Sequence, residues 1–140
     1  MAKFKFRLET LRMVRAQEAE DAKVALLQAQ RERIEMEGQI SELTARRRES
    51  MKESKAKNFG DRVTLQHWMD ALDLQQHQAE AALCILLNEE EACREIWHKR
   101  QQASDALEKL RERHKQEFDL EVIRREQADL DEWAVMRRKA

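Results

Sequence analysis

The residues in this chain that could do chemistry are four histidines, two cysteines and many carboxylates. His67, His77, His98 and His114 are dispersed, and no two of them stand four residues apart, the spacing that places two metal ligands on one helical face. The sequence has no CxxC motif and no glycine-rich phosphate loop. It therefore predicts no metal site, no cofactor site and no enzyme activity.

The cysteines and the carboxylates have structural explanations. Cys84 and Cys93 would lie on opposite faces of one helix, about 13 Å apart along its axis, which is too far for a disulfide. We interpret both as reduced residues packed as small apolar side chains. The carboxylates occur in runs such as residues 89–91, which are typical of solvated helix faces.

The elements that must position these residues are long helices. The chain has no proline and two glycines, 39% of its residues are charged, and 5% are aromatic. A strand-rich fold would need turn residues every ten or so positions. The hydrophobic fraction of 41% argues against disorder, but too few large apolar side chains are present to fill a globular core. Composition therefore favours a narrow seam between helices.

The first apolar stripe has the spacing of a coiled coil and predicts a helix over about residues 4–56. Its positions follow steps of three and four, with Arg15, Glu18 and Arg33 as interruptions: Leu8, Leu11, Ala22, Ala25 or Leu26, Ala29, Met36, Ile40 and Leu43.

One stretch carries convincing stop signals and predicts a turn at about residues 57–61. Asn58 and Gly60 suit a left-handed cap at the end of the first helix. Asp61 is then a candidate N-cap for the next helix, with Thr64 as its rival.

The second stripe predicts a helix over about residues 62–138. It comprises Leu65, Trp68 or Met69, Leu72, Ala79, Ala82 or Leu83, Leu86, Cys93, Ile96 or Trp97, Ala103, Leu107 and Leu110, and more loosely Phe118, Ile123, Leu130 and Trp133. A short turn makes neighbouring helices antiparallel. We therefore predict an all-α fold, a long antiparallel two-helix coiled-coil hairpin forming a single domain over residues 1–140.

The unequal helix lengths predict a C-terminal helix overhang. Pairing outward from the turn sets the N-terminus near residue 114, so about 25 residues of the second helix would project without a partner. Large apolar side chains without a partner indicate a contact surface. The candidates in the overhang are Phe118, Ile123, Leu130 and Trp133.

Two further groups are candidates for protein contacts. Phe4, Phe6 and Arg7 belong to a basic and apolar N-terminal end, whose rings either dock on a partner or simply cap the seam. At the far tip, Trp68 and Met69 are adjacent and cannot both face the seam, so one of them is exposed. Trp68 and Leu72 are the candidates at that tip, and Leu72 suits the seam equally well.

Charge and hydropathy restrict the other partners. A net charge of −1 argues against a nucleic-acid-binding hairpin, which needs surplus positive charge. No apolar run approaches the roughly 20 residues of a membrane span, so we expect no membrane insertion. The basic start lacks the apolar region of a signal peptide, and the expected compartment is the cytoplasm.

Residues 4–15, which read Phe-Lys-Phe-Arg-Leu-Glu-Thr-Leu-Arg-Met-Val-Arg, resemble the opening of the FliJ family of the flagellar type III export apparatus. That family typically starts Phe-x-Phe-Arg-Leu-x-x-Leu-Leu-x-x-Arg, and Met13 stands near the expected second leucine. Residues 124–132 are similar to the family's ending, where Ala128 replaces the usual lysine. The injectisome counterpart of the same machinery is a close alternative.

This resemblance implies an antiparallel coiled coil that binds the export ATPase hexamer and the cytoplasmic domain of the export gate, and that escorts export chaperones. It also implies a largely monomeric protein at the cytoplasmic face of the cell membrane. The N-terminal end and the overhang would then face the ATPase ring, and the tip around Trp68 and Leu72 would face the gate. A competing hypothesis is a generic dimeric coiled-coil scaffold whose overhang self-associates.

Overall fold

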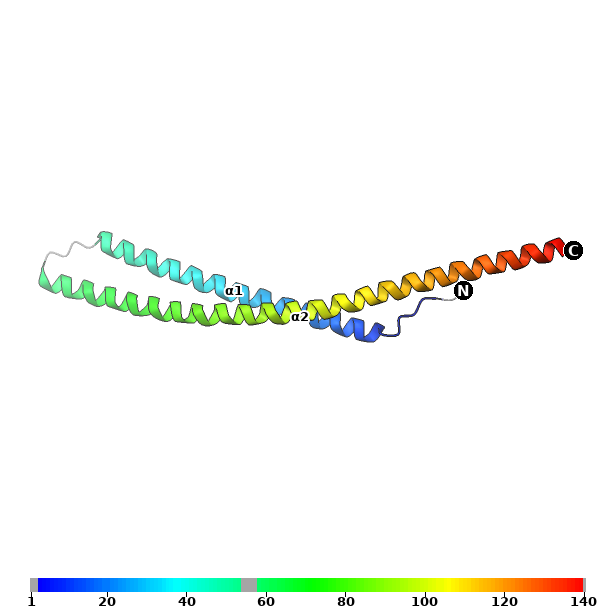
Figure 1. The fold of residues 1–140 in the computed structure, drawn as a ribbon. Coiled ribbons are helices and arrows are strands. Elements are labelled where there is room, and N and C mark those ends of the chain that lie inside the picture. The colour runs from blue at the N-terminus through cyan, green and yellow to red at the C-terminus, as the bar shows by residue number, and fades with distance from the viewer. Residues whose placement is uncertain (1–2, 54–57, 140) are drawn as a thin grey trace. The chain divides into compact units, whose positions relative to one another are not determined.

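A computed structural model describes residues 3–53 and 58–139 of the chain (Figure 1). They form two helices, α1 (Glu9–Glu53, 45 residues) and α2 (Phe59–Lys139, 81 residues), and no strand occurs among them. The two helices pack against each other, which confirms the predicted all-α helical hairpin.

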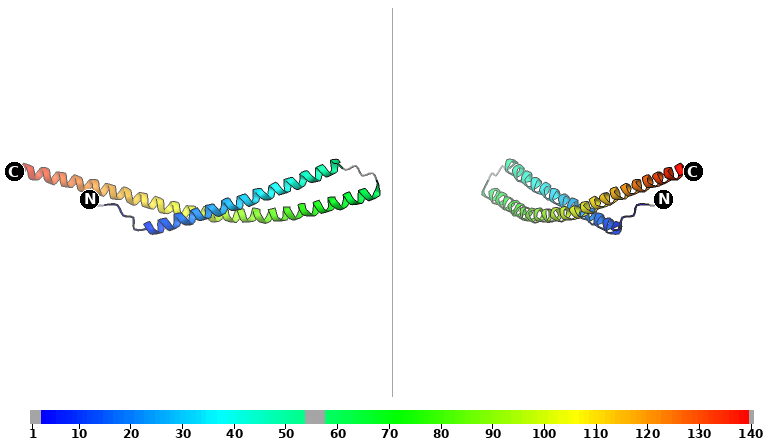
Figure 2. Two further views of the ribbon diagram at one scale, coloured as in Figure 1. Left: turned by 180° about the vertical axis from the view of Figure 1, so that it is seen from behind. Right: turned by 45° about the vertical axis from the view of Figure 1, so that its right-hand side comes forward.

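The contacts group the chain into two compact units. Unit 1 comprises Met1–Glu20 and His98–Ala140, and unit 2 comprises Asp21–Trp97. Each unit contains part of α1 and part of α2, and Figure 2 shows the two parts of unit 2 side by side from two directions. The single domain over residues 1–140 stays a prediction.

In unit 2 the buried positions follow the predicted coiled-coil spacing. Ala22, Leu26 and Ala29 are buried on α1, and Met69 and Leu72 are buried on α2. Steps of three and four keep these side chains on one face of each helix. Where the sequence left two neighbours open, Leu26 faces the seam instead of Ala25, and Met69 faces it instead of Trp68.

Cross-helix pairs show that the helices are antiparallel in each unit. In unit 2, Arg33 pairs with Glu90, and Arg47 lies 3.0 Å from Asp73, so residue numbers rise on α1 as they fall on α2. In unit 1, Arg12 Nη1 lies 2.6 Å from Glu108 Oε1 and Arg111 Nε lies 3.4 Å from Glu9 Oε2, so the same opposite order holds there. Each pair bridges the two helices, so polar contacts across or beside the seam accompany the apolar packing.

The start of α2 corrects the predicted capping. The amide of Asp61 donates to Asn58 Oδ1 at 2.8 Å, so Asn58 is the N-cap of α2 in place of Asp61. The predicted cap at the end of the first helix falls next to residues outside the described ones. Gly60 lies in the first turn of α2, and no described glycine has a positive φ. The Thr64 hydroxyl donates to the Gly60 carbonyl at 3.0 Å within α2, so Thr64 is not the N-cap of this helix.

The predicted boundaries shift accordingly. Helix α2 begins at Phe59, three residues before the predicted start at 62, and ends at Lys139, one residue beyond the predicted end. The predicted end of the first helix at 56 and the start of the turn at 57 lie outside the described residues.

The predicted helix start at residue 4 is wrong. Residues 3–8 are non-helical, with a turn at residues 7 and 8, and α1 begins at Glu9, whose amide donates to the Phe6 carbonyl at 3.1 Å. A helix would turn Phe4 and Phe6 about 200° apart, whereas an extended chain points both side chains the same way. Burial of both rings against α2 therefore favours the extended form.

Candidate protein-binding surfaces

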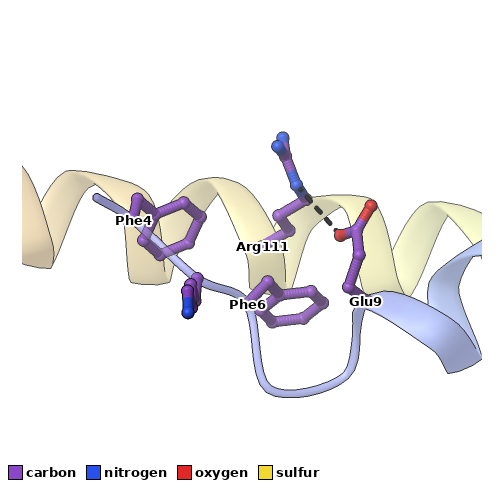
Figure 3. A pocket seen from close by; sticks show the side chains of 5 residues that line it. Phe4, Phe6, Glu9 and Arg111 are labelled. Carbon is purple, nitrogen blue, oxygen red and sulfur yellow. Dashed lines mark ion pairs between the residues drawn. The ribbon is translucent and has the colours of Figure 1, made fainter.

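Residues 3–8, which we call the N-terminal strap, pack on α2 through two aromatic contacts in unit 1. Figure 3 shows the strap with Phe4 and Phe6 beside α2. The ring centroids of Phe4 and Phe118 lie 5.6 Å apart at an interplanar angle of 52°. Those of Phe6 and His114 lie 5.6 Å apart at 71°, an edge-to-face arrangement. Phe6 is 8% exposed and Phe4 is half-buried, so both rings are used within the chain.

Arg111 of α2 joins the strap to the first residue of α1. Its guanidinium carbon lies 5.9 Å from the centre of the Phe4 ring, and its Nε lies 3.4 Å from Glu9 Oε2, an ion pair without hydrogen-bond geometry. Phe4, Lys5, Phe6, Glu9 and Arg111 line a shallow hollow here, and Figure 3 shows the Arg111–Glu9 pair beside both rings.

The strap is held by a few side-chain contacts, which are opposed by the entropy cost of fixing an extended segment. Burial contributes about 1.5–3 kcal/mol for each phenylalanine, and each aromatic pair adds about 0.5–1.5 kcal/mol. Fixing the backbone of six residues costs about 1–2 kcal/mol each. These opposing contributions are of the same order, so the position of the strap on α2 depends on both of its rings.

Charged residues occupy the seam where α1 begins. The Arg12 side chain, 23% exposed, pairs with Glu9 and with Glu108 across the seam. The hydrogen bond from Arg12 lowers the pKa of the Glu9 carboxyl, and nearby Arg111 lowers it further against the effect of desolvation. Hydrogen bonds to Glu9 and Glu108 raise the pKa of Arg12. Leu11, which the sequence placed in the seam, is 39% exposed because Arg12 holds that position.

We call residues 119–139 of α2 the C-terminal overhang. Three of the four candidate contact residues that the sequence placed in the overhang lie in this segment. Phe118 is not among them, because the extended strap reaches it and Phe4 packs on its ring. Among the described residues, the ion pairs and ring contacts of the overhang join its own neighbours, such as Arg137 over the Trp133 ring at 5.2 Å. Val122 is half-buried and every other described residue of the overhang is exposed, so no helix of the described chain packs along it.

The overhang exposes large apolar side chains on one helical face. Leu120, Ile123 and Leu130 are 54%, 58% and 61% exposed, and their spacing of three and seven residues places them in one stripe. Trp133 is 57% exposed near the edge of that stripe. A stripe of this spacing is typical of a helix face that packs on another helix.

The hairpin tip is the part of unit 2 nearest residues 53 and 58. The two predicted contact residues at this tip differ in exposure. Trp68 is 52% exposed, and its Nε1 donates to Ser50 Oγ at 3.0 Å. Leu72 is 4% exposed and belongs to the seam, so its contribution is to packing. Sequence reasoning missed the neighbouring hollow lined by Arg47, Met51, Arg62, Leu65, Gln66, Met69 and Asp73.

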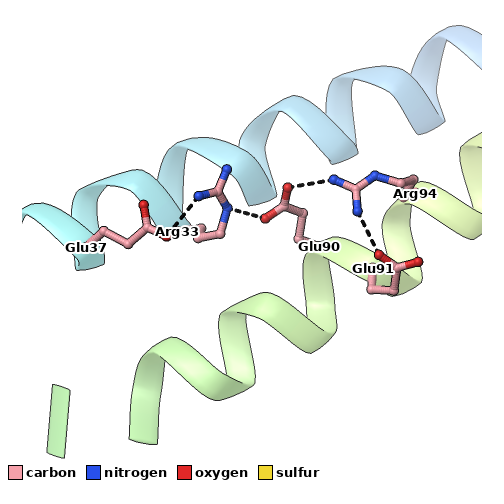
Figure 4. A network of polar contacts seen from close by, with 5 residues as sticks. All are labelled: Arg33, Glu37, Glu90, Glu91 and Arg94. Atoms are coloured by element: carbon pink, nitrogen blue, oxygen red, sulfur yellow. Dashed lines mark hydrogen bonds and ion pairs between the residues drawn. The ribbon is translucent and has the colours of Figure 1, made fainter. Parts of the chain in front are cut away.

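A polar network interrupts the seam in the middle of unit 2 (Figure 4). Arg33 pairs with Glu90 across the seam and with Glu37 at 2.9 Å on its own helix, and both hydrogen bonds raise the pKa of Arg33. Arg94 holds the second oxygen of Glu90 at 2.9 Å. Glu90 is 4% exposed, so the expectation of a solvated face at residues 89–91 is wrong for this residue. Its buried carboxylate is fully paired by two arginines.

Other chemical groups form no site in the described part of the chain. Cys84 is exposed and Cys93 is half-buried, and both are free. No group of three or more potential metal ligands occurs in residues 3–53 and 58–139. No described helix is long and apolar enough to cross a membrane.

These features define a helical hairpin with large apolar side chains exposed along its C-terminal overhang. The model of the flagellar FliJ protein family matches residues 4–139, and the chain therefore belongs to that family. It is thus a component of the flagellar export apparatus, in a family that is not catalytic. No curated protein and no solved structure matches the chain.

Proposed function

We propose that this chain binds the export ATPase hexamer and the cytoplasmic domain of the export gate, and that it escorts export chaperones. The observation that carries this proposal is the C-terminal overhang, whose apolar stripe has no partner helix in the described chain. In this proposal the protein acts as a monomer in the cytoplasm, associated peripherally with the cell membrane through its partners.

At the ATPase end, Ile123, Leu130 and Trp133 make the direct contacts, because they are more than half exposed. Arg7 is exposed at the strap and adds a positive charge to the same unit. Phe4, Phe6 and Phe118 contribute by fixing the strap on α2, since their rings pack within the chain. Apolar anchors with a charged rim are the usual composition of a protein interface.

At the hairpin tip, Trp68 makes the contact with the gate. The residue is 52% exposed, while the hydrogen bond to Ser50 fixes the orientation of its ring. A tryptophan held in one rotamer loses little entropy on binding and is a favourable anchor. Leu72 supports this surface from the seam below.

The test for the ATPase end replaces Ile123 and Leu130 together by serine and measures binding to the purified ATPase hexamer. The matched control replaces Ile85 and Leu74, which are 60% and 61% exposed in unit 2. We expect the overhang variant to lose at least tenfold in affinity and the control to bind as the unchanged chain does. Equal binding by both variants would refute the assignment.

The test for the two ends uses single tryptophan variants. Trp68→Ala is expected to weaken binding to the gate domain about tenfold or more, the usual effect of truncating a hot spot, and to leave ATPase binding unchanged. Trp133→Ala is expected to do the reverse. The two side chains are 52% and 57% exposed, so each serves as the control for the other. Loss of both activities in either variant would contradict separate binding ends.

A further inference from the structure

We propose that the face of α2 formed by Arg111, His114 and Phe118 is a binding site for an extended segment with aromatic side chains at positions i and i+2. In the free protein the N-terminal strap occupies this site, and a partner protein with such a segment takes its place. The site does not depend on which protein binds the overhang.

The strap shows what the site recognises. Each of its two rings has its own ring partner on α2, Phe4 with Phe118 and Phe6 with His114, and both centroid distances are 5.6 Å. Arg111 adds its guanidinium over the Phe4 ring at 5.9 Å. All three groups of α2 therefore contact aromatic side chains of one short segment, and Figure 3 shows Arg111 beside the two phenylalanine rings of that segment.

The spacing of the rings explains the i, i+2 pattern. Two residues of extended chain rise about 6.6 Å, and their side chains point to the same side. His114 and Phe118 are four residues apart on a helix, a rise of about 6 Å. Side chains at positions i and i+2 of an extended segment are therefore separated by about one helical turn of α2. In a helical segment, the same two side chains would point in different directions.

The strap is held in a way that permits exchange. In the described chain its backbone carbonyls at Phe6 and Leu8 accept hydrogen bonds from Glu9 and Arg12 of α1, and no backbone hydrogen bond joins the strap to α2. Its departure from α2 therefore breaks side-chain contacts alone. Lys3, Lys5 and Arg7 alternate with the rings and are exposed, so a competing segment can carry different residues at those positions.

Because the chain's own strap occupies the site, a competing segment must bind tightly enough to displace it. A short tether gives an effective concentration in the millimolar range, so a strap docked for most of the time implies an intrinsic dissociation constant of about 1 mM or below. A competing segment meets an apparent affinity reduced by the fraction of protein whose site is free. A partner held elsewhere on the chain gains the same tethering advantage and displaces the strap.

The direct test adds a synthetic peptide with the sequence of residues 3–8 to the full chain and follows the α2 backbone amides by NMR. The receiving chains are the unchanged protein and Phe4→Ala/Phe6→Ala, whose own strap is weakened. We expect the variant to bind with a dissociation constant of about 1 mM or below, with shifts at residues 111–118, and the unchanged protein to need at least tenfold more peptide. A peptide with both phenylalanines replaced by alanine is the matched control and should produce no shifts.

A second measurement tests the receptor side. Phe118→Ala removes one ring from the site, and we expect faster trypsin cleavage after Lys5 and Arg7 together with unchanged helicity. Adding Phe118→Ala to the strap variant should abolish peptide binding. Equal peptide binding by the unchanged and strap-variant chains, or unchanged cleavage in Phe118→Ala, would overturn the proposal. In a further outcome, the unchanged chain dimerises with rising concentration while the strap variant does not. That result would overturn the proposal of a different partner protein and would assign the site to the strap of a second copy.

Discussion

Replacement of Leu72 by alanine separates a seam residue from a surface residue. Leu72 is 4% exposed between α1 and α2, so the change removes three buried carbon atoms and leaves a cavity. Buried leucine-to-alanine changes cost about 2–5 kcal/mol. A two-helix seam can collapse partly around the gap, so we expect the lower part of that range, about 2–3 kcal/mol in the free energy of unfolding.

Urea unfolding followed by circular dichroism measures this effect. We expect the midpoint to fall while the slope stays constant, because the surface exposed on unfolding hardly changes. Leu74→Ala is the matched control, since Leu74 is two residues away and 61% exposed, and it should change stability by less than about 0.5 kcal/mol. Equal effects of the two variants would refute the assignment of Leu72 to the seam.

Three further expectations concern charge and capping. Glu90→Ala should lower the melting temperature more than Glu89→Ala, because the loss of Glu90 leaves two arginines without their buried partner. Thermal scans in which both variants melt at the same temperature would contradict this expectation. The lowered pKa of Glu9 gives a stabilisation present above its unfolded value near 4.3 and lost as pH falls through the folded-state pKa. The NMR signals of residues 3–8 should therefore move toward those of an undocked chain as pH falls below about 4.3, and Glu9→Gln should remove that dependence. Asn58→Ala should cost about 0.5–2 kcal/mol in urea unfolding, whereas Thr64→Ala should cost clearly less.

Sequence reasoning worked best where one helical period repeats many times. The absence of proline and the stripe spacing predicted two helices and most of their seam, including Leu26, Ala29 and Leu72. Capping was harder, because Asn58 suits both the end of one helix and the start of the next. The hydrogen bond to the Asp61 amide decides between them, and it exists only once the chain is folded.

The candidate site was predictable in part. Exposed Ile123, Leu130 and Trp133 follow from comparing helix lengths, which is arithmetic on the sequence. Glu90 was missed because its neighbours look like an ordinary charged face, and its burial depends on Arg33, which is 57 residues away in the sequence. A charge stays in a seam only when its partner lies opposite, and that register is a tertiary property.

By itself, the sequence determined that this protein is a pair of helices with a seam and an unpaired end, because helical period and chain length are local quantities. Only the tertiary structure decided what the first residues do. Phe4 and Phe6 leave the helix because α2 offers Phe118 and His114 at the matching separation, and burial of both rings outweighs one more helical turn. Because the strap is extended, it reaches Phe118 and shortens the unpaired part of α2. The aromatic face of α2 is therefore covered by residues of the same chain.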